Sequence, residues 1–199
     1  MTVVADAARE AAPIKYMEGI WGEVNKRLFA DDTRSVYAVL DGASVPELRM
    51  KLYEHQPECI CLFQGDLKPD MAEVAPYLIH LQIDTQFTNW VIEKGWGNHW
   101  GIFALSRGEL RDMRKHFRRF LTVHTSEGKP MRFRYYDPRV MRRFLPACNT
   151  EDLAALFNQV DYYLLEDEDA GVMLSFHAES GALKQEKFKL NGAQGFPQK

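Results

Sequence analysis

Hydrophobic residues recur along this chain in two patterns, one with helical spacing and one typical of strands. Apolar residues three and four apart predict an amphipathic helix over residues 14–30. Runs of β-branched and aromatic residues predict strands at 35–43, 58–63, 77–83 and 99–106. Helical patterns and start signals predict helices between and after these strands, at 46–53, 84–94 and 108–119.

The second half of the chain predicts hairpins and short helices. The runs FLTVHT (120–125) and MRFRYY (131–136) predict two strands around a polar turn, with Phe133 and Tyr135 on one strand face. Asp137 followed by Pro138 predicts a capped helix that ends at Phe144. A further short helix is expected over 150–157, then a hairpin from 160–166 and 171–177, and a polar tail.

Strands alternate with helices over residues 35–119 and hairpins follow, which predicts an α/β (mixed α+β) fold. We expect a mixed β-sheet flanked by helices, with a small C-terminal lobe. The segments are an N-terminal helix and frayed end (1–34), a main domain (35–165) and a short C-terminal hairpin and tail (166–199). The predicted core includes Val36, Val39, Ile60, Leu62, Leu78, Ile102 and Phe133.

Composition supports a protein with one core and no membrane span. The chain has 199 residues, of which 46% are hydrophobic, enough for one main domain. The N-terminus has neither the positive start nor the apolar run of a signal peptide, and no apolar stretch reaches the ~20 residues of a membrane helix. We therefore expect a cytoplasmic protein, with Cys59, Cys61 and Cys148 as reduced thiols.

The net charge of −3 is unevenly distributed. Residues 107–143 hold 12 basic and 4 acidic side chains, whereas residues 1–106 hold 9 and 15 and residues 144–199 hold 4 and 9. The middle segment is therefore strongly basic between two acidic flanks. Such asymmetry influences which partners the protein meets and leaves the fold undecided.

The helix at 108–119 carries two stripes. Leu110, Met113 and Phe117 form an apolar face that would dock the helix, and a second stripe consists of Arg107, Arg111, Arg114 and Arg118. Arginine suits bidentate contacts at interfaces, so this stripe is a candidate protein-binding site. The alternatives are a solvated face and internal pairing with the acidic residues 166–169. Nucleic acid is disfavoured because the pI is about 6.1 and no recognition motif accompanies the stripe.

No recognisable catalytic or cofactor motif occurs. The chain lacks the glycine-rich phosphate loops, the G-x-S-x-G elbow and metal-ligand spacing among its six histidines, so we expect no metal and no cofactor. Trp96, His99 and Trp100 lie in W-G-N-H-W-G, which suggests either a stacking pocket for a base or sugar or rings packed under a glycine turn. Packing is the favoured interpretation.

Asp137 lies beside arginines, in F-R-Y-Y-D-P-R. Arg134 and Arg139 would keep its carboxyl ionised and make it a poor general acid, so we interpret Asp137 as a helix cap and charge anchor. Together with Asp41 of the Asp-Gly turn, Trp96 and His99, Asp137 and Arg139 form the predicted set of structural motif residues.

An ordered set of segments resembles a known family. The segments are YAVLDGA (37–43), CLFQGD (61–66), APYLIHL (75–81), WGNHWGIFALS (96–106), the arginine-rich helix leading into FLTV (120–123), and MRFRYYDPRVMRRFLP (131–146). Their succession resembles the type VI secretion effector-adaptor chaperones of the Tap/TEC family, formerly a domain of unknown function. The resemblance covers about residues 35–165; only residues 166–199 follow, whereas the family often has a longer C-terminal lobe.

The resemblance implies a non-enzymatic adaptor. Such proteins bind a specific toxin effector in the bacterial cytoplasm and help to load it on the VgrG spike or a PAAR tip protein, without nucleic acid or membrane as partners. Two alternatives stay open. One is an enzyme of unfamiliar type with a pocket around Asp41, His99 and Asp137, and the other is a nucleic-acid module that uses the arginine-rich helix.

Overall fold

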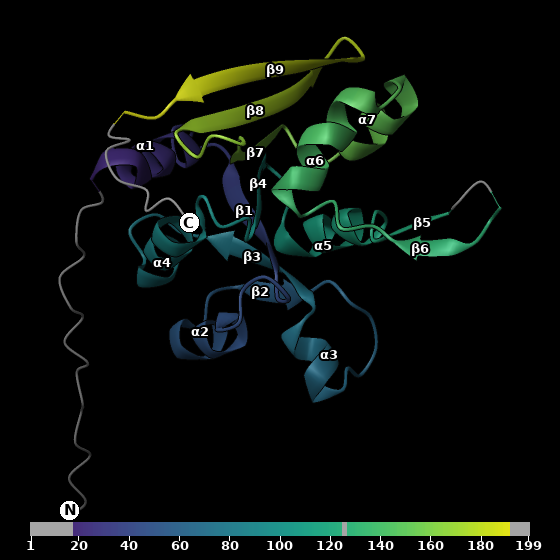
Figure 1. The fold of residues 1–199 in the computed structure, drawn as a ribbon, viewed down its shortest axis with the longest axis horizontal. Coiled ribbons are helices and arrows are strands. Elements are labelled where there is room, and N and C mark those ends of the chain that lie inside the picture. The colour runs from purple at the N-terminus through teal and green to yellow at the C-terminus, as the bar shows by residue number, and fades with distance from the viewer. Residues whose placement is uncertain (1–17, 125–126, 192–199) are drawn as a thin grey trace, which may run out of the picture.

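The computed structural model describes residues 18–124 and 127–191. Figure 1 shows a central sheet between two layers of helices. The helices are α1 (Gly19–Leu28), α2 (Leu48–His55), α3 (Pro69–Glu73), α4 (Gln86–Gly95), α5 (Leu110–Arg118), α6 (Pro138–Phe144), a 3-10 turn η1 (Leu145–Ala147) and α7 (Thr150–Leu156). The strands are β1 (Ser35–Asp41), β2 (Cys59–Cys61), β3 (Pro76–Leu81), β4 (Gly101–Ser106), β5 (Thr122–His124), β6 (Pro130–Arg132), β7 (Tyr162–Glu166), β8 (Val172–Glu179) and β9 (Ala182–Lys189).

Seven strands form the main sheet, in the order β2-β3-β1-β4-β7-β8-β9, while β5 and β6 form a separate hairpin. Neighbouring strands of the main sheet are antiparallel throughout, so the sheet is not mixed as the sequence suggested. The predicted α/β class with helices on both faces is confirmed.

The helix–strand alternation did identify real crossovers. The helix α2 connects β1 to β2, and α4 connects β3 to β4, and each pair of strands runs in the same direction. In each case an antiparallel strand lies between the two, β3 in the first pair and β1 in the second. This interlocking is the split β-α-β arrangement of ferredoxin-like units, and it leaves no parallel neighbours.

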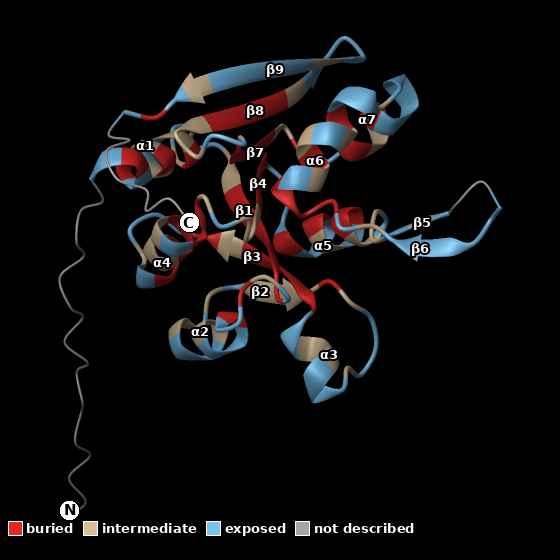
Figure 2. Ribbon diagram, viewed as in Figure 1, coloured by how far each residue is buried: buried red, intermediate tan, exposed pale blue. Residues whose placement is uncertain are grey.

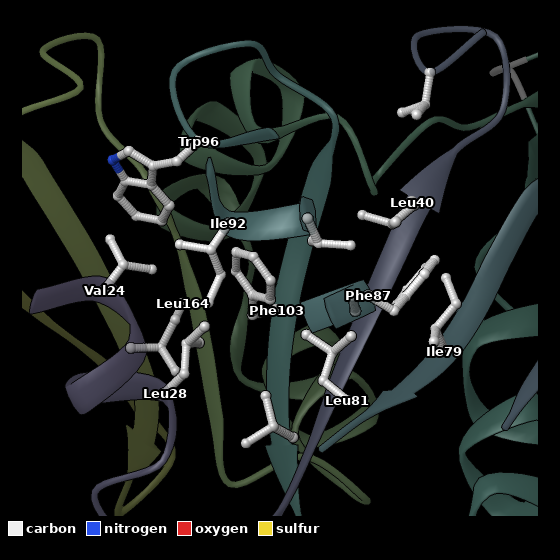
Figure 3. Packing of buried hydrophobic residues seen from close by; sticks show 14 of the residues in the cluster. Val24, Leu28, Leu40, Ile79, Leu81, Phe87, Ile92, Trp96, Phe103 and Leu164 are labelled. Carbon is white, nitrogen blue, oxygen red and sulfur yellow. The ribbon is translucent and has the colours of Figure 1, made fainter. Parts of the chain in front are cut away.

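One hydrophobic cluster fills the space between the sheet and the layer of α1, α2 and α4. Figure 3 shows Val24 and Leu28 of α1 and Phe87 and Ile92 of α4 packed over side chains of the sheet. All four are almost completely buried, while the outer faces of these helices are largely exposed (Figure 2). The amphipathic pattern of α1 and α4 therefore anchors them to this side of the sheet.

A second cluster lies on the opposite face, under α5, α6 and α7. Met113 and Phe117 of α5 pack there with Tyr135, and Phe117 and Tyr135 stack with ring centroids 5.9 Å apart. Of the predicted core, Val36, Val39, Leu62, Leu78 and Ile102 are buried. Ile60 and Phe133 are half-buried against this second cluster.

The structure differs from the predicted elements at residues 133–136 and in the C-terminal segment. Residues 133–136 do not continue β6 as a strand; Tyr135 and Tyr136 are both buried, because the chain turns there under α5. The predicted hairpin of 160–166 and 171–177 is present as β7 and β8, but it belongs to the main sheet instead of a small lobe, and residues 182–189, expected to be polar tail, form β9. Residues 14–17 of the first predicted helix lie outside the described residues.

Candidate functional site

The predicted motif residues gather at one edge of the sheet, the edge formed by the ends of its inner strands and not by an outermost strand. Asp41 ends β1, Glu166 ends β7, and residues 96–100 lead into β4, which lies between those two strands. Since neighbouring strands are antiparallel, these ends and this start meet at the same edge. The segment 134–142 joins them through Arg134, Asp137, Arg139 and Arg142. We call this set the arginine–carboxylate network.

Asp41 is the first buried acid of the network, with 1% of its surface exposed. Its carboxylate accepts hydrogen bonds from the Ala43 backbone N–H (3.1 Å) and the Ser44 hydroxyl (2.9 Å), and it forms an ion pair with Arg134. Gly42 must be glycine, because a Cβ there would lie 2.4 Å from the Glu73 carbonyl oxygen. The predicted Asp-Gly turn thus fixes the position of the Asp41 carboxylate, which in turn forms an ion pair with Arg134.

Asp137 caps α6, as the sequence predicts. One carboxylate oxygen accepts the backbone N–H of Arg139 at 2.9 Å, and the carboxylate also accepts the Arg139 Nε at 3.0 Å and Nη2 at 2.7 Å. Burial acts to raise the pKa of Asp137, but the hydrogen bonds and charge of Arg139 outweigh it and hold the pKa below its ordinary value. Asp137 is therefore a structural anion at neutral pH.

Glu166 is the third buried acid, 4% exposed, and it ends the predicted strand 160–166 and begins the acidic residues 166–169. It accepts hydrogen bonds from the backbone N–H groups of Gly97 and His99 and pairs with the His99 ring Nδ1. His99 has a positive φ of 58°, which turns both its N–H and its ring towards this carboxylate. Burial raises the pKa of Glu166, and these hydrogen bonds oppose the rise.

The network has a common design, in which a buried acid positions a basic side chain that is much more exposed than the acid. The side chains of Asp41, Asp137 and Glu166 are 2%, 8% and 4% exposed, whereas those of Arg134, Arg139 and His99 are 45%, 55% and 35% exposed. Arg142 Nη1 adds a hydrogen bond to the Glu166 carbonyl oxygen at 3.0 Å. The surface of this edge is consequently basic, and the acids lie beneath it.

The tryptophans of W-G-N-H-W-G do not form a stacking pocket with each other. Trp96 is buried, donates its indole N–H to the Ala170 carbonyl at 2.7 Å and stacks on Phe103. Trp100 packs against Trp90 of α4, with ring centroids 4.8 Å apart. The gap lined by both Trp96 and Trp100 has a volume of only ≈ 10 Å³, room for about one water molecule.

The four arginines of the predicted binding stripe have different environments. Arg118 points inward and donates to the carbonyls of Cys61, the last residue of β2, and of Leu62 and Phe63, which follow it. Arg107 pairs with Asp161 at 3.3 Å. Arg111 is exposed and Arg114 half-buried, and neither makes an ion pair with a described residue. In the part of the chain covered by the structure, none of the four pairs with residues 166–169.

Sequence reasoning did not single out Glu166 or Arg142 for this site. Both lie at positions where the local pattern gave only a general signal, an acidic run after a strand and a basic last turn of a helix. Among the described residues there is no group of three metal-ligating side chains, and no helix is long and apolar enough to cross a membrane. The cysteines Cys59, Cys61 and Cys148 carry free thiols.

Comparison with known families gives one match. A family model described as "Domain of unknown function (DUF4123)" matches residues 36–155, more than half of the chain. The match begins with β1 and ends within α7, and it includes Asp41, the turn at 96–100 and α6. No curated protein and no solved structure matches the chain.

Proposed function

Because the chain belongs to the DUF4123 family, we propose that it is a non-enzymatic adaptor of a bacterial type VI secretion system. In this role it binds one toxin effector in the cytoplasm and helps to load it on the VgrG spike or a PAAR tip protein. The observation that carries the proposal is the family match, which spans the same ordered segments that resemble the Tap/TEC chaperones.

The geometry of the network supports a binding role. Asp41 and Asp137 are each engaged by an arginine, and Glu166 by a histidine and two backbone N–H groups. Such acids orient cations towards a partner, and arginine forks oriented in advance lose less entropy when they bind a carboxylate. Neither the enzyme around Asp41, His99 and Asp137 nor the nucleic-acid module gains an observation in its favour.

The arginine-rich helix keeps part of its proposed role. Arg111 and Arg114 of α5 have no carboxylate partner among the described residues, so they remain candidates for partner contacts. Arg118 stabilises the fold through hydrogen bonds to backbone carbonyls, and Arg107 forms an ion pair with Asp161. We therefore place the partner-binding part of α5 at its exposed face around Arg111.

Co-expression tests the adaptor role directly. The tagged chain is produced with each protein encoded beside its gene, and complexes are isolated and sized. We expect a stable complex with a large toxin and, through it or directly, with a VgrG or PAAR protein. Capture of neither protein by the folded chain would contradict the proposal.

A further inference from the structure

A surface groove follows α6 on the side that faces the turn between β7 and β8. It has a volume of ≈ 770 Å³ and is open to solvent along its length. On the α6 side its lining consists of Asp137, Arg139, Val140, Arg142, Arg143, Phe144 and Ala147. Glu168, on the turn after β7, lines the opposite side.

The groove has an excess of positive charge. Arg143 is exposed and makes no hydrogen bond or ion pair with any described residue. Arg142 uses one N–H on the Glu166 carbonyl and has no carboxylate of its own; the nearby Asp167 is bonded to Lys187 at 2.9 Å. The Asp137 carboxylate is committed to Arg139. Glu168 is the remaining acid of the lining, and it is exposed.

Apolar surface lies directly beside these guanidinium groups. Val140 and Phe144 are half-buried, and Ala147 is exposed. The Phe144 ring is held against Phe133, with centroids 4.7 Å apart, so this part of the floor is fixed in position. Arginine next to aromatic and aliphatic surface is the composition typical of protein-binding surfaces, and the guanidinium fork matches a carboxylate.

We propose that the α6 groove receives an acidic segment of a partner protein. Carboxylates of the segment bind Arg142 and Arg143, and an apolar side chain beside them packs on Val140 and Phe144. The positive charge of the groove favours a negatively charged ligand, and its apolar floor favours a peptide over a nucleic-acid backbone. The identification of the partner as a secretion effector or spike protein rests on the proposed function. The preference of the groove for an acidic segment rests on its own residues.

Peptide binding to the full chain tests the groove. The probe is a synthetic fluorescent peptide in which glutamates alternate with leucines and glycines, and the reference peptide has glutamine in place of every glutamate. Fluorescence anisotropy should give an affinity about tenfold higher for the glutamate peptide, and this difference should shrink as salt is raised. Equal affinity for both peptides would overturn the proposal.

Three matched variants locate the site. Arg143→Glu, which removes no hydrogen bond or ion pair with a described residue, should weaken binding of the glutamate peptide about tenfold, and Glu168→Gln should strengthen it severalfold. Lys68→Glu changes the net charge as much as Arg143→Glu but lies at the start of α3, far from α6 (Figure 1), and should leave the affinity nearly unchanged. Equal losses in Lys68→Glu and Arg143→Glu, at unchanged melting temperatures, would mean that no specific groove exists.

Two further outcomes separate this proposal from others. If single-stranded DNA binds more tightly than the peptide and Arg143→Glu abolishes that binding, the groove is a nucleic-acid site and the proposal is wrong. If the wild-type chain captures its effector and Arg143→Glu captures it equally well, the groove proposal fails while the adaptor role stands. If the chain binds the peptide but captures neither an effector nor a spike protein, the groove proposal is supported and the adaptor role is contradicted.

Discussion

Two of the buried carboxylates at one edge of the sheet take their basic partners from distant parts of the chain. Arg134 reaches Asp41 across 93 positions, and His99 reaches Glu166 across 67. Removing a single partner would leave a buried charge unpaired, which costs more than the pair contributes. Each pair thus couples the folding of two segments.

Substitution of Asp137 tests whether its role is structural. Asp137→Ala removes the cap of α6 and the partner of Arg139, so it should lower the free energy of unfolding by about 2 kcal/mol. Asp137→Asn keeps a capping oxygen and loses only the charge, and about 1 kcal/mol is expected. Urea denaturation measures both. Unchanged stability together with loss of a measurable turnover would indicate a catalytic role instead.

His116 gives the stability a dependence on pH. It is buried, and burial together with the neighbouring Arg119 lowers its pKa to about 4. Between about pH 6.5 and pH 4 the unfolded chain binds a proton at this position that the folded chain does not. The free energy of unfolding should therefore fall as pH falls through this window, by on the order of 3 kcal/mol in total.

The variant His116→Gln isolates this effect, because glutamine does not titrate. Denaturation curves at several pH values should show a shallower loss of stability in His116→Gln than in the wild type. His124→Gln, at an exposed position of β5, is the matched control and should keep the wild-type slope. Identical slopes in all three proteins would show that His116 does not carry the dependence.

At the scale of elements, local signals fixed α6 and tertiary contacts overrode the pattern next to it. The Asp-Pro start gave the bounds of α6 correctly, since capping depends on neighbours in sequence. The alternation in residues 132–136 predicted a strand, but Tyr135 donates its hydroxyl to the Phe117 carbonyl, and both tyrosines are buried. That hydrogen bond joins segments that are distant in sequence, so the spacing of apolar residues near Tyr135 does not reveal it.

The strand β9 escaped prediction for a different reason. Leu183 packs on the cluster under α5, while Phe188 packs on the cluster under α1, so its two inward residues belong to opposite faces. The remaining residues are exposed and, apart from Ala182, polar. Alternation of period two arises when one face is buried, and β9 lies at the sheet edge with neither face fully covered.

Two arginines of α5 should differ in how much the same substitution costs in stability. Arg118→Glu loses hydrogen bonds to the carbonyls after β2 and places an anion near them, so the free energy of unfolding should fall by about 2–3 kcal/mol. Arg111→Glu, on the exposed face, should stay within about 0.5 kcal/mol of the wild type. Urea denaturation of both variants decides. Equal destabilisation would contradict the inward role of Arg118.

At the scale of the whole molecule, the family match and the folding unit do not coincide. The match ends at residue 155, but β7, β8 and β9 extend the sheet beyond β4. They bring Tyr163, Leu165, Leu174 and Phe176 into the second cluster, all almost completely buried. Burial of each large side chain contributes about 1.5–3 kcal/mol to the free energy of unfolding. Removal of all four would therefore cost an amount comparable to the stability of a typical domain.

A chain of residues 36–155 should consequently lack a cooperative thermal transition, whereas a chain of residues 18–191 should keep one. Circular dichroism during heating distinguishes the two. A sharp transition in the shorter chain would show that the matched region folds without the last three strands.

The outer edge of β9 bears on how these molecules behave when crowded together. In the described sheet β9 has a neighbour on one side only, which leaves a row of backbone N–H and C=O groups open to another chain. Exposed edges of this kind promote strand-to-strand aggregation, and lysine is a common safeguard. The strand carries Lys184, Lys187 and Lys189 and a single acid, Glu186, so its excess of lysine is of the kind that discourages edge-to-edge pairing of two copies. The same strand that completes the sheet therefore carries residues of the kind that work against the addition of a further strand.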